Sequence, residues 1–284
     1  MLETCRQCAG ELKPVGSSYK CTCCGAVYES LEELHPERRS YQKNSNPYYG
    51  NTAQVPFSNV QGMGAPAYPN VEQYDHGVDV FDMNIKAVLE ITWSDERCTH
   101  SGSGFLVSRD GYAITNTHVV TYENGRSCER VNVKICGQNV KADVIKLGDN
   151  LHGSGNGVDL ALIKLNQVPQ DAVTVTFENF NNVRNGERVF VIGNSLGYGT
   201  CITSGIVSDR SRTVDGERLL MTDCAVNGGN SGGPIFNEFG RVIGAIVSGI
   251  AGAEGMNFAI PADTVIGFMK DNHMSTSQYT VDHS

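Results

Sequence analysis

Residues 101–120 read SGSGFLVSRDGYAITNTHVV, a β-rich segment with a turn in its middle. The turn is RDG, whose glycine can adopt the positive φ that a hairpin turn requires. Similar turns follow at ENG, RNGE, VDGE and EFGR. Short runs rich in β-branched residues lie between them, namely RVNVKI, KADVIKL, DLALIKL, RVFVIGN, CITSGIVS, RLLMTD and RVIGAIVSG. Strands this short at this spacing predict an all-β barrel or sandwich.

The rest of the chain differs from this β-rich part in composition and in the period of its apolar residues. A convincing helical period occurs near the end, in PADTVIGFMK at residues 261–270. Ahead of the β-rich part lies a segment rich in Pro, Gly, Asn and Gln, with too few aliphatic residues to bury a core. We therefore expect four parts, which are residues 1–29, a short helix with a flexible linker at 30–77, the β-rich domain at 78–270 and a C-terminal tail at 271–284.

Composition and charge narrow the function classes. The 284 residues include 40% hydrophobic and 19% charged residues, which is an ordinary globular balance. A formal net charge of −9 makes nucleic acid an unlikely partner. The N-terminal residues do not resemble a secretory signal, and no apolar run has the ~20 residues that a bilayer span needs. The sequence thus predicts a cytoplasmic protein without a membrane span, unless an export signal has been trimmed away.

Four of the ten cysteines form two C-x-x-C pairs, CRQC and CTCC, separated by twelve residues. Each pair can hold one side of a tetrahedral Zn²⁺ ion, with a small hairpin between them. The pattern resembles a four-cysteine zinc ribbon with ligands Cys5, Cys8, Cys21 and Cys24, although Cys23 could replace Cys24 in a poorer match. Four thiolates leave no open position for water, so the zinc is expected to be structural and catalysis to need no cofactor. The ribbon is a candidate site for a protein partner.

A serine surrounded by glycines stands out in NGGNSGGPI, residues 227–235. A serine hydroxyl attacks a carbonyl only when a base removes its proton. Glycines allow the backbone to approach a substrate closely, so that the amides of Gly229 and Ser231 can converge on an oxyanion. The glycine run alone would also fit a linker.

A base and an acid that could serve Ser231 occur earlier in the chain. His118 ends the β-like run YAITNTHVV, where a strand gives way to a loop. Asp159 directly precedes the alternating strand LALIKL, and an aspartate buried there would need a partner such as an imidazole. Taken singly, each could be a structural residue. The order His, Asp, Ser on an all-β chain indicates nucleophilic catalysis.

The segments quoted above, together with GMNFAIP at residues 255–261, resemble the trypsin-like serine proteases of the HtrA (Deg) type over roughly residues 78–270. The resemblance implies two packed six-stranded β-barrels, at about 78–170 and 171–262, with the cleft between them and a short C-terminal helix. It implies that His118 is the general base, Asp159 its orienting partner and Ser231 the nucleophile.

The resemblance also suggests binding residues and assembly. Gly229 and Ser231 would supply oxyanion amides with help from Asn230. Ala225 would form the floor of the primary pocket, and Val247, Ser248 and Gly249 would line one wall. No acid stands at that floor, which favours small or medium apolar side chains. The family forms trimers and carries a C-terminal PDZ domain, whereas this chain ends about 20 residues after FAIP.

The sequence therefore predicts a serine endopeptidase that acts on exposed segments of unfolded or damaged proteins. A first alternative is a latent or inactive peptide-binding module that a partner recruits through the zinc ribbon. A second is a nucleic-acid factor targeted by the ribbon, which the acidic charge disfavours. The thiol of Cys224, close to Ser231 in sequence, suggests sensitivity to oxidants.

Overall fold

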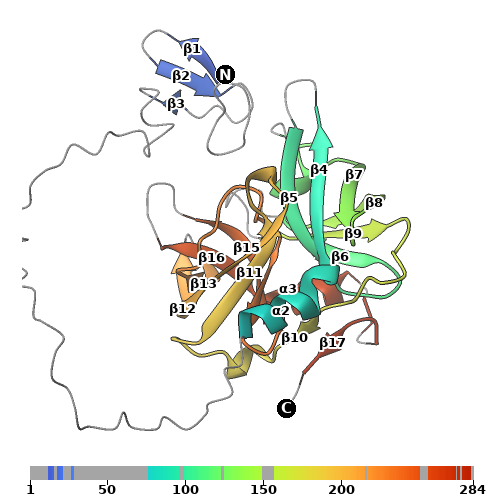
Figure 1. Cartoon of the computed structure of the whole chain (residues 1–284), viewed down its shortest axis with the longest axis vertical. Helices are drawn as coiled ribbons and strands as arrows, with labels where there is room; N and C mark the ends of the chain where they lie inside the picture. Colours follow the sequence, from blue (N-terminus) through green and yellow to red (C-terminus); the bar gives the residue numbers. More distant parts are fainter. Residues whose placement is uncertain are drawn as a thin grey trace, which may run out of the picture.

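The computed structural model of the chain describes residues 12–15, 18–21, 27–28, 76–95, 99–122, 125–148, 157–214, 216–249, 255–272, 274–275 and 277–282. Most of the linker expected at 30–77 lies outside these ranges. The described part is mostly β, as the sequence predicts. Figure 1 shows a group of strands in cyan to green and a second group in yellow to red.

The first group of strands closes into a six-stranded barrel. Its strands are β4 (Val88–Ser94), β5 (Thr99–Leu106), β6 (Tyr112–Thr115), β7 (Arg130–Ile135), β8 (Gln138–Leu147) and β9 (Ala161–Leu165). They pair in the order β4-β5-β6-β9-β8-β7, and β4 pairs back to β7. In β7 the residues Val131, Val133 and Ile135 are buried and those between them are exposed, which is the alternation expected of a strand with one face on a core.

The turns predicted from the sequence are confirmed by their backbone angles. A positive φ occurs at the glycine of each predicted turn, which are Gly111, Gly125, Gly186, Gly216 and Gly240. One further turn has no Asn-Gly or Asp-Gly signal. Cys136 and Gly137 join β7 to β8 in two residues, both with positive φ, as a type I′ hairpin requires.

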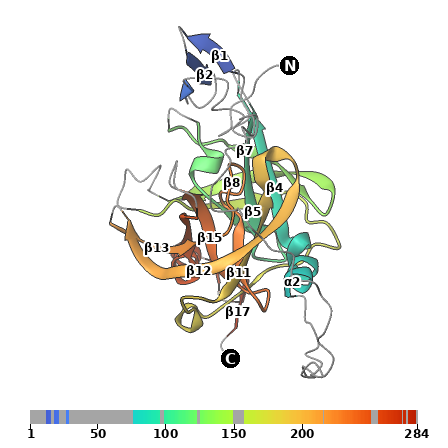
Figure 2. The same ribbon diagram turned by 60° about the vertical axis from the view of Figure 1, so that its left-hand side comes forward.

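The second group of strands forms an eight-stranded sheet in the order β14-β11-β12-β13-β16-β15-β10-β17. The strands are β10 (Thr176–Phe177), β11 (Arg188–Asn194), β12 (Thr200–Val214), β13 (Glu217–Thr222), β14 (Pro234–Asn237), β15 (Val242–Gly249), β16 (Asn257–Pro261) and β17 (Thr280–Val281). An additional pairing joins β14 to β15. Figure 2 shows how the long strand β12 curves across this half. A second six-stranded barrel stays a prediction.

The C-terminal residues belong to this sheet. Helix α3 (Ala262–Asp271) covers the predicted helical segment and buries Val265 and Met269. The residues beyond it, expected to be a tail, include the buried Met274 and Tyr279 and the strand β17, which runs parallel to β10. The tail expectation does not fit these residues. The sequence did not show this because the apolar side chains of this segment are widely spaced and find their partners only across the sheet.

Helix α2 (His76–Asn84) precedes the barrel and was not expected from the sequence. Val80 is fully buried, and the side-chain amide of Asn84 donates to the carbonyl oxygen of Gly240 at 3.2 Å. The helix therefore packs on the second half although it leads into the first.

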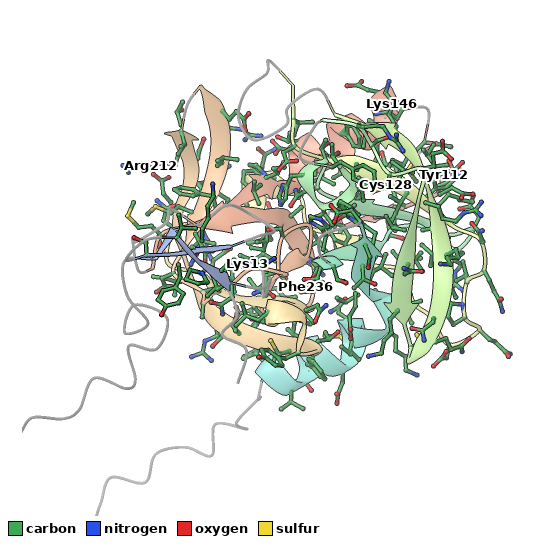
Figure 3. All side chains as sticks on the ribbon, turned by 90° about the horizontal axis from the view of Figure 1, so that it is seen from above. Lys13, Tyr112, Cys128, Lys146, Arg212 and Phe236 are labelled. Carbon is green, nitrogen blue, oxygen red and sulfur yellow. The ribbon has the colours of Figure 1, made fainter. Side chains whose placement is uncertain are left out.

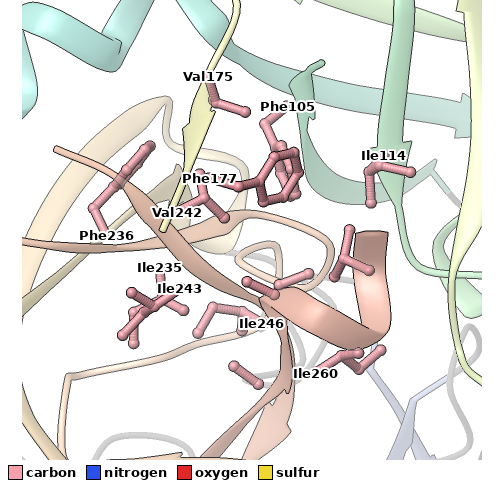
Figure 4. Packing of buried hydrophobic residues seen from close by; sticks show 14 of the residues in the cluster. Phe105, Ile114, Val175, Phe177, Ile235, Phe236, Val242, Ile243, Ile246 and Ile260 are labelled. Carbon is pink, nitrogen blue, oxygen red and sulfur yellow. The ribbon is translucent and has the colours of Figure 1, made fainter. Parts of the chain in front are cut away.

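One hydrophobic core joins the two halves. Phe105 and Ile114 from the first barrel belong to the same buried cluster as Phe177, Val242 and Ile246 from the second sheet (Figure 4). A separate cluster fills the inside of the first barrel. Viewed from above, Tyr112 and Cys128 lie on the barrel side of the molecule and Arg212 lies on the opposite side (Figure 3). The shared core fixes the two halves against each other, so residues at their junction can form a rigid site.

Near the N-terminus, three short strands form an antiparallel sheet in the order β1-β2-β3. They are β1 (Leu12–Val15), β2 (Ser18–Cys21) and β3 (Val27–Tyr28). The hairpin of β1 and β2, in which Leu12 pairs with Cys21, follows the first cysteine pair in sequence and ends at Cys21, the first cysteine of the second pair.

Candidate functional site

His118 and Asp159 meet because adjacent strands carry them. His118 starts the short 3₁₀ helix η3 (His118–Val120) just after β6, and Asp159 precedes β9, which pairs with β6. The Nδ1 atom of His118 lies 2.6 Å from Oδ2 of Asp159, and the backbone N–H of His118 donates to Oδ1 at 3.1 Å. Both carboxylate oxygens of Asp159, a residue that is only 4% exposed, are thus bound by one residue. This double contact sets the orientation of the imidazole.

Two side chains that the sequence analysis did not single out hold the loop of Asp159. The side-chain amide of Asn116 donates to the backbone oxygen of Asp159 at 2.7 Å. The hydroxyl of Thr117 donates to the backbone oxygen of Leu160 at 2.8 Å. Both residues stand directly before His118 in TNTHVV, but nothing in the local sequence shows that they face a segment 43 positions away.

Ser231 stands in the turn that leads into β14, on the second half of the molecule, and is half-buried. Its Oγ donates to the backbone oxygen of Val247 at 2.9 Å. Its own backbone oxygen accepts from the N–H of Ser103, in β5 of the first barrel, at 2.8 Å. The serine therefore lies at the junction of the two halves.

Gly229 has a φ of +95°, and a Cβ there would lie 2.1 Å from the backbone oxygen of Asn194. Glycine is required at this position on both counts. Asn230, expected to assist an oxyanion, is only 1% exposed, and its backbone N–H donates to the oxygen of Asn227 at 3.1 Å. Asn230 is placed to hold the turn together rather than to meet a substrate.

The expected pocket residues lie on two segments of the second half. Ala225 is exposed, and its backbone oxygen accepts from the hydroxyl of Thr203 at 2.9 Å. Val247 is half-buried in β15. Ser248 and Gly249 follow it in the same strand and pair through their backbones with β16. The side chains of Ser248 and Gly249 are outside the described part of the chain.

The expected zinc ligands lie largely outside the described part of the chain. Cys5, Cys8 and Cys24 lie outside the described residues, and Cys21 is described only through its backbone at the end of β2. Within the ranges that the structure describes, no group of three His, Cys, Asp or Glu side chains is arranged to hold a metal ion.

The thiol of Cys224 is fully buried, and burial raises its pKa to about 11. Burial likewise raises the pKa of Cys128 to about 11. The expectation that Cys224 confers sensitivity to oxidants is therefore not supported, because the thiolate is the reactive form and an oxidant needs access to it.

We expect Cys224 and Cys128 to resist alkylation in the folded protein. At pH 8 a thiol with a pKa near 11 is only about 0.1% thiolate, and the fraction rises as the pH approaches the pKa. Iodoacetamide treatment at pH 8, followed by peptide mass spectrometry, should leave both unmodified while the half-buried Cys201 reacts. Unfolding in urea should equalise the labelling. Rapid labelling of native Cys224 would contradict the burial argument.

Gly232 provides a test of how tightly the serine turn packs. Its φ is +82°, and a Cβ there would lie 2.3 Å from the hydroxyl of Thr115 and 2.4 Å from the backbone oxygen of Ser103. Gly232→Ala should lower the free energy of unfolding by about 2–4 kcal/mol, measured by urea denaturation. Gly186→Ala is the matched control, since it shares the positive φ but has nothing within 4 Å of its Cβ. Equal losses would show that packing at Gly232 contributes nothing.

Comparison with known proteins identifies the class. The chain matches the family model of the trypsin-like peptidase domain over residues 102–244, half of its length. The chain belongs to this trypsin-like peptidase family. This confirms the trypsin-like character expected from the motifs and supports a serine-type endopeptidase.

Individual relatives refine this assignment. A probable periplasmic serine endoprotease, DegP-like, from Brucella suis is 40% identical over 175 residues, which cover 60% of this chain and 32% of that protein. Its namesake from Rickettsia conorii is 32% identical over 228 residues, which cover 77% and 42%. The chain thus spans about a third to two fifths of the curated relatives that it matches.

Comparison with solved structures supports the same assignment. The serine endoprotease from Yersinia pestis superposes with a TM-score of 0.57 at 28% identity, over 68% of this chain and 65% of that one. The HtrA-type protease AlgW, solved with a tripeptide, gives a TM-score of 0.60 at 26% identity, over 68% and 62%. The HtrA/DegP resemblance is confirmed.

The expected location is not supported by these relatives. Their names place the DegP-like proteins in the periplasm, whereas we expected the cytoplasm. Among the described residues, no helix has the length and apolar character that a bilayer span requires.

Proposed function

We propose that this protein is a serine endopeptidase in which Ser231 is the nucleophile, His118 the general base and Asp159 the residue that orients the base. The observation that carries the proposal is the pair of hydrogen bonds that the carboxylate of Asp159 makes with the backbone N–H and Nδ1 of His118. A carboxylate that binds Nδ1 leaves Nε2 as the nitrogen that acts on the serine.

In the proposed reaction His118 removes the proton of Ser231 while Oγ attacks the carbonyl carbon of the scissile peptide bond. A hydroxyl carries one hydrogen, so transfer to His118 requires that the bond from Oγ to the oxygen of Val247 be given up. His118 then protonates the leaving amine, and an acyl-enzyme remains on Ser231. Water, deprotonated by His118, hydrolyses the ester and restores the hydroxyl.

The tetrahedral intermediate needs donors for its oxyanion, and the amides of Gly229 and Ser231 are the proposed pair. The positive φ of Gly229 supports this role, since it turns the backbone in a way that a side chain would disfavour. Two backbone donors cost no reorganisation during the reaction, which is why such sites contribute strongly to catalysis.

The test combines labelling with cleavage. The chain should react with a fluorophosphonate probe at Ser231, located by peptide mass spectrometry, and should cut unfolded casein. Labelling without any cleavage would favour a latent enzyme, and labelling elsewhere or not at all in the folded chain would favour the inactive peptide-binding module. The casein cut sites should follow small or medium apolar residues, because Ala225 brings no counter-charge to the pocket.

The N-terminal cysteines are proposed to hold one structural Zn²⁺ ion through Cys5, Cys8, Cys21 and Cys24. The β1–β2 hairpin, which joins the first pair to Cys21 of the second, supports this, because two C-x-x-C knuckles joined by a hairpin match a ribbon. Thiolates would bind the ion and leave no position for a catalytic water. Elemental analysis of the purified chain should give one zinc per chain, and Cys5→Ser with Cys8→Ser should abolish it.

The substrates proposed are exposed segments of unfolded or damaged proteins, with a protein partner at the ribbon and a trimeric assembly. The substrates and the trimer are suggested by the similarity to HtrA-type and DegP-like proteases, and the protein partner by the proposed zinc ribbon. We also propose a second packed barrel in residues 171–262. The additional pairing of β14 with β15 supports it.

A further inference from the structure

Ser103 makes several hydrogen bonds across the junction of the two halves. It lies in β5 of the first barrel and is fully buried. Its hydroxyl donates to the backbone oxygen of Gly229 at 2.7 Å and accepts from the backbone N–H of Asn194 at 2.8 Å. Its backbone N–H donates to the oxygen of Ser231 at 2.8 Å. One buried serine thus binds two segments of the second half.

The strand behind Ser103 holds it in place. The hydroxyl of Thr115, in β6, donates to the backbone oxygen of Ser103 at 2.7 Å, and Thr115 is itself fully buried. A Cβ at Gly193 would come within 2.9 Å of the hydroxyl oxygen of Ser103, and one at Gly233 within 3.0 Å of its Cβ. The surrounding backbone leaves Ser103 little room to move.

These contacts bear on the direction of the two proposed oxyanion amides. All peptide bonds among the described residues are trans, so the N–H and C=O of each peptide point in opposite directions. The oxygen of Gly228 accepts from the N–H of Leu196 at 2.6 Å, which fixes the N–H of Gly229. The oxygen of Asn230 accepts from the N–H of Gly233 at 2.9 Å, which fixes the N–H of Ser231.

Ser103 fixes the peptide units next to these two amides. The carbonyl groups of Gly229 and Ser231 belong to the peptide units that follow the two amides. Ser103 binds both carbonyl oxygens. Asn194, which Ser103 also holds, has its backbone oxygen directly against Gly229 and precedes Leu196 by two residues. Without the hydroxyl, the oxygen of Gly229 and the N–H of Asn194 would be unpaired in a buried site, at a cost that rotation of the peptides could relieve.

We propose that Ser103 is a positioning residue for the oxyanion site, acting from the first barrel through Gly229 and Asn194. The proposal rests on the function proposed above. A serine with only a structural role would stabilise the fold without a specific effect on the chemical step. A positioning serine would instead affect the step in which the oxyanion forms, and leave ground-state binding of the peptide unchanged.

The test compares Ser103→Ala with Ser101→Ala, an exposed serine two residues away in the same strand. Ser103→Ala should lower kcat by about 10- to 100-fold with KM within about threefold, and weaken a peptidyl boronate inhibitor by a similar factor. The boronate reports the site because its tetrahedral adduct with Ser231 places an oxygen among the oxyanion donors. Ser101→Ala should match the unaltered chain.

Amide hydrogen exchange provides a second readout that needs no activity. Peptides covering residues 194–199 and 225–233 should exchange faster in Ser103→Ala, while peptides from β7 and β8 should not change. Ser103→Cys, whose thiol is somewhat larger than the hydroxyl and donates only weakly, should give intermediate values and replaces the alanine variant if that one fails to fold.

Two results would overturn the proposal. One is a Ser103→Ala protein with unchanged kcat and boronate affinity and only a lower melting temperature. The other is unchanged exchange in both peptides. If the unaltered chain neither cleaves nor reacts with the probe, the proposed function fails, and the exchange measurement alone decides whether Ser103 orders the turn.

Discussion

Ser231→Ala is expected to reduce kcat for casein or peptide cleavage by about 10⁶-fold, down to the rate that binding and oxyanion stabilisation support alone. The reason is that the alanine methyl group has no atom that can form the acyl-enzyme. The turn should remain intact, since its backbone bond to Ser103 does not involve the hydroxyl. Cleavage rates by mass spectrometry and labelling with the fluorophosphonate probe measure the loss.

The matched control for this loss is Ser211→Ala, an exposed serine in β12. It should cleave at the rate of the unaltered chain. Circular dichroism of both variants should match that of the unaltered protein. If Ser231→Ala keeps more than about a tenth of the activity, the nucleophile is a different group or a contaminating protease is present.

Asp159→Asn is expected to lower kcat by about 10⁴-fold with little change in structure. Both oxygens of Asp159 accept hydrogen bonds from donors of the same residue, the backbone N–H and Nδ1 of His118. Asparagine offers one acceptor and one donor in that geometry, so one of the two contacts becomes N–H against N–H. The ring then favours the tautomer with its proton on Nε2, which cannot accept the proton of Ser231.

The measurement for Asp159→Asn is kcat and KM on a peptide substrate across pH 5–9, with Asp110→Asn as control. Asp110 is an exposed carboxylate that pairs with Lys164 at 3.0 Å, so its loss should leave both constants unchanged. We expect the loss for Asp159→Asn to fall on kcat rather than KM, because the ring acts on the reacting atoms and not on the rest of the peptide. A fall of less than about tenfold would contradict the orienting role of Asp159.

Local chemistry in the sequence was sufficient for the turns and for most strands. A glycine after Asp, Asn or Phe predicts a turn because it alone accepts a positive φ without strain, and all five predicted turns have it. The runs RVNVKI and RVFVIGN match β7 and β11 residue for residue. The helix α3 followed from its own period.

Elements with weak local signals were missed. Helix α2 and the short strands β10 and β17 owe their place to partners far along the chain. Strand β17, with two residues, has no local pattern, and it pairs with a strand about 100 residues earlier. The stability of such pieces comes from tertiary packing, which the local pattern does not encode.

The same division holds at the site. The order of His118, Asp159 and Ser231 on a β-rich chain, with glycines around the serine, was sufficient to predict the class of chemistry, because that reaction requires these functional groups. Only the tertiary structure shows that both oxygens of Asp159 bind His118, that Asn230 is turned inward and that Ser103 binds the serine turn. The physical reason is that a residue type reveals which bonds a side chain can make, whereas its actual partners depend on which distant strands the hydrophobic core brings together.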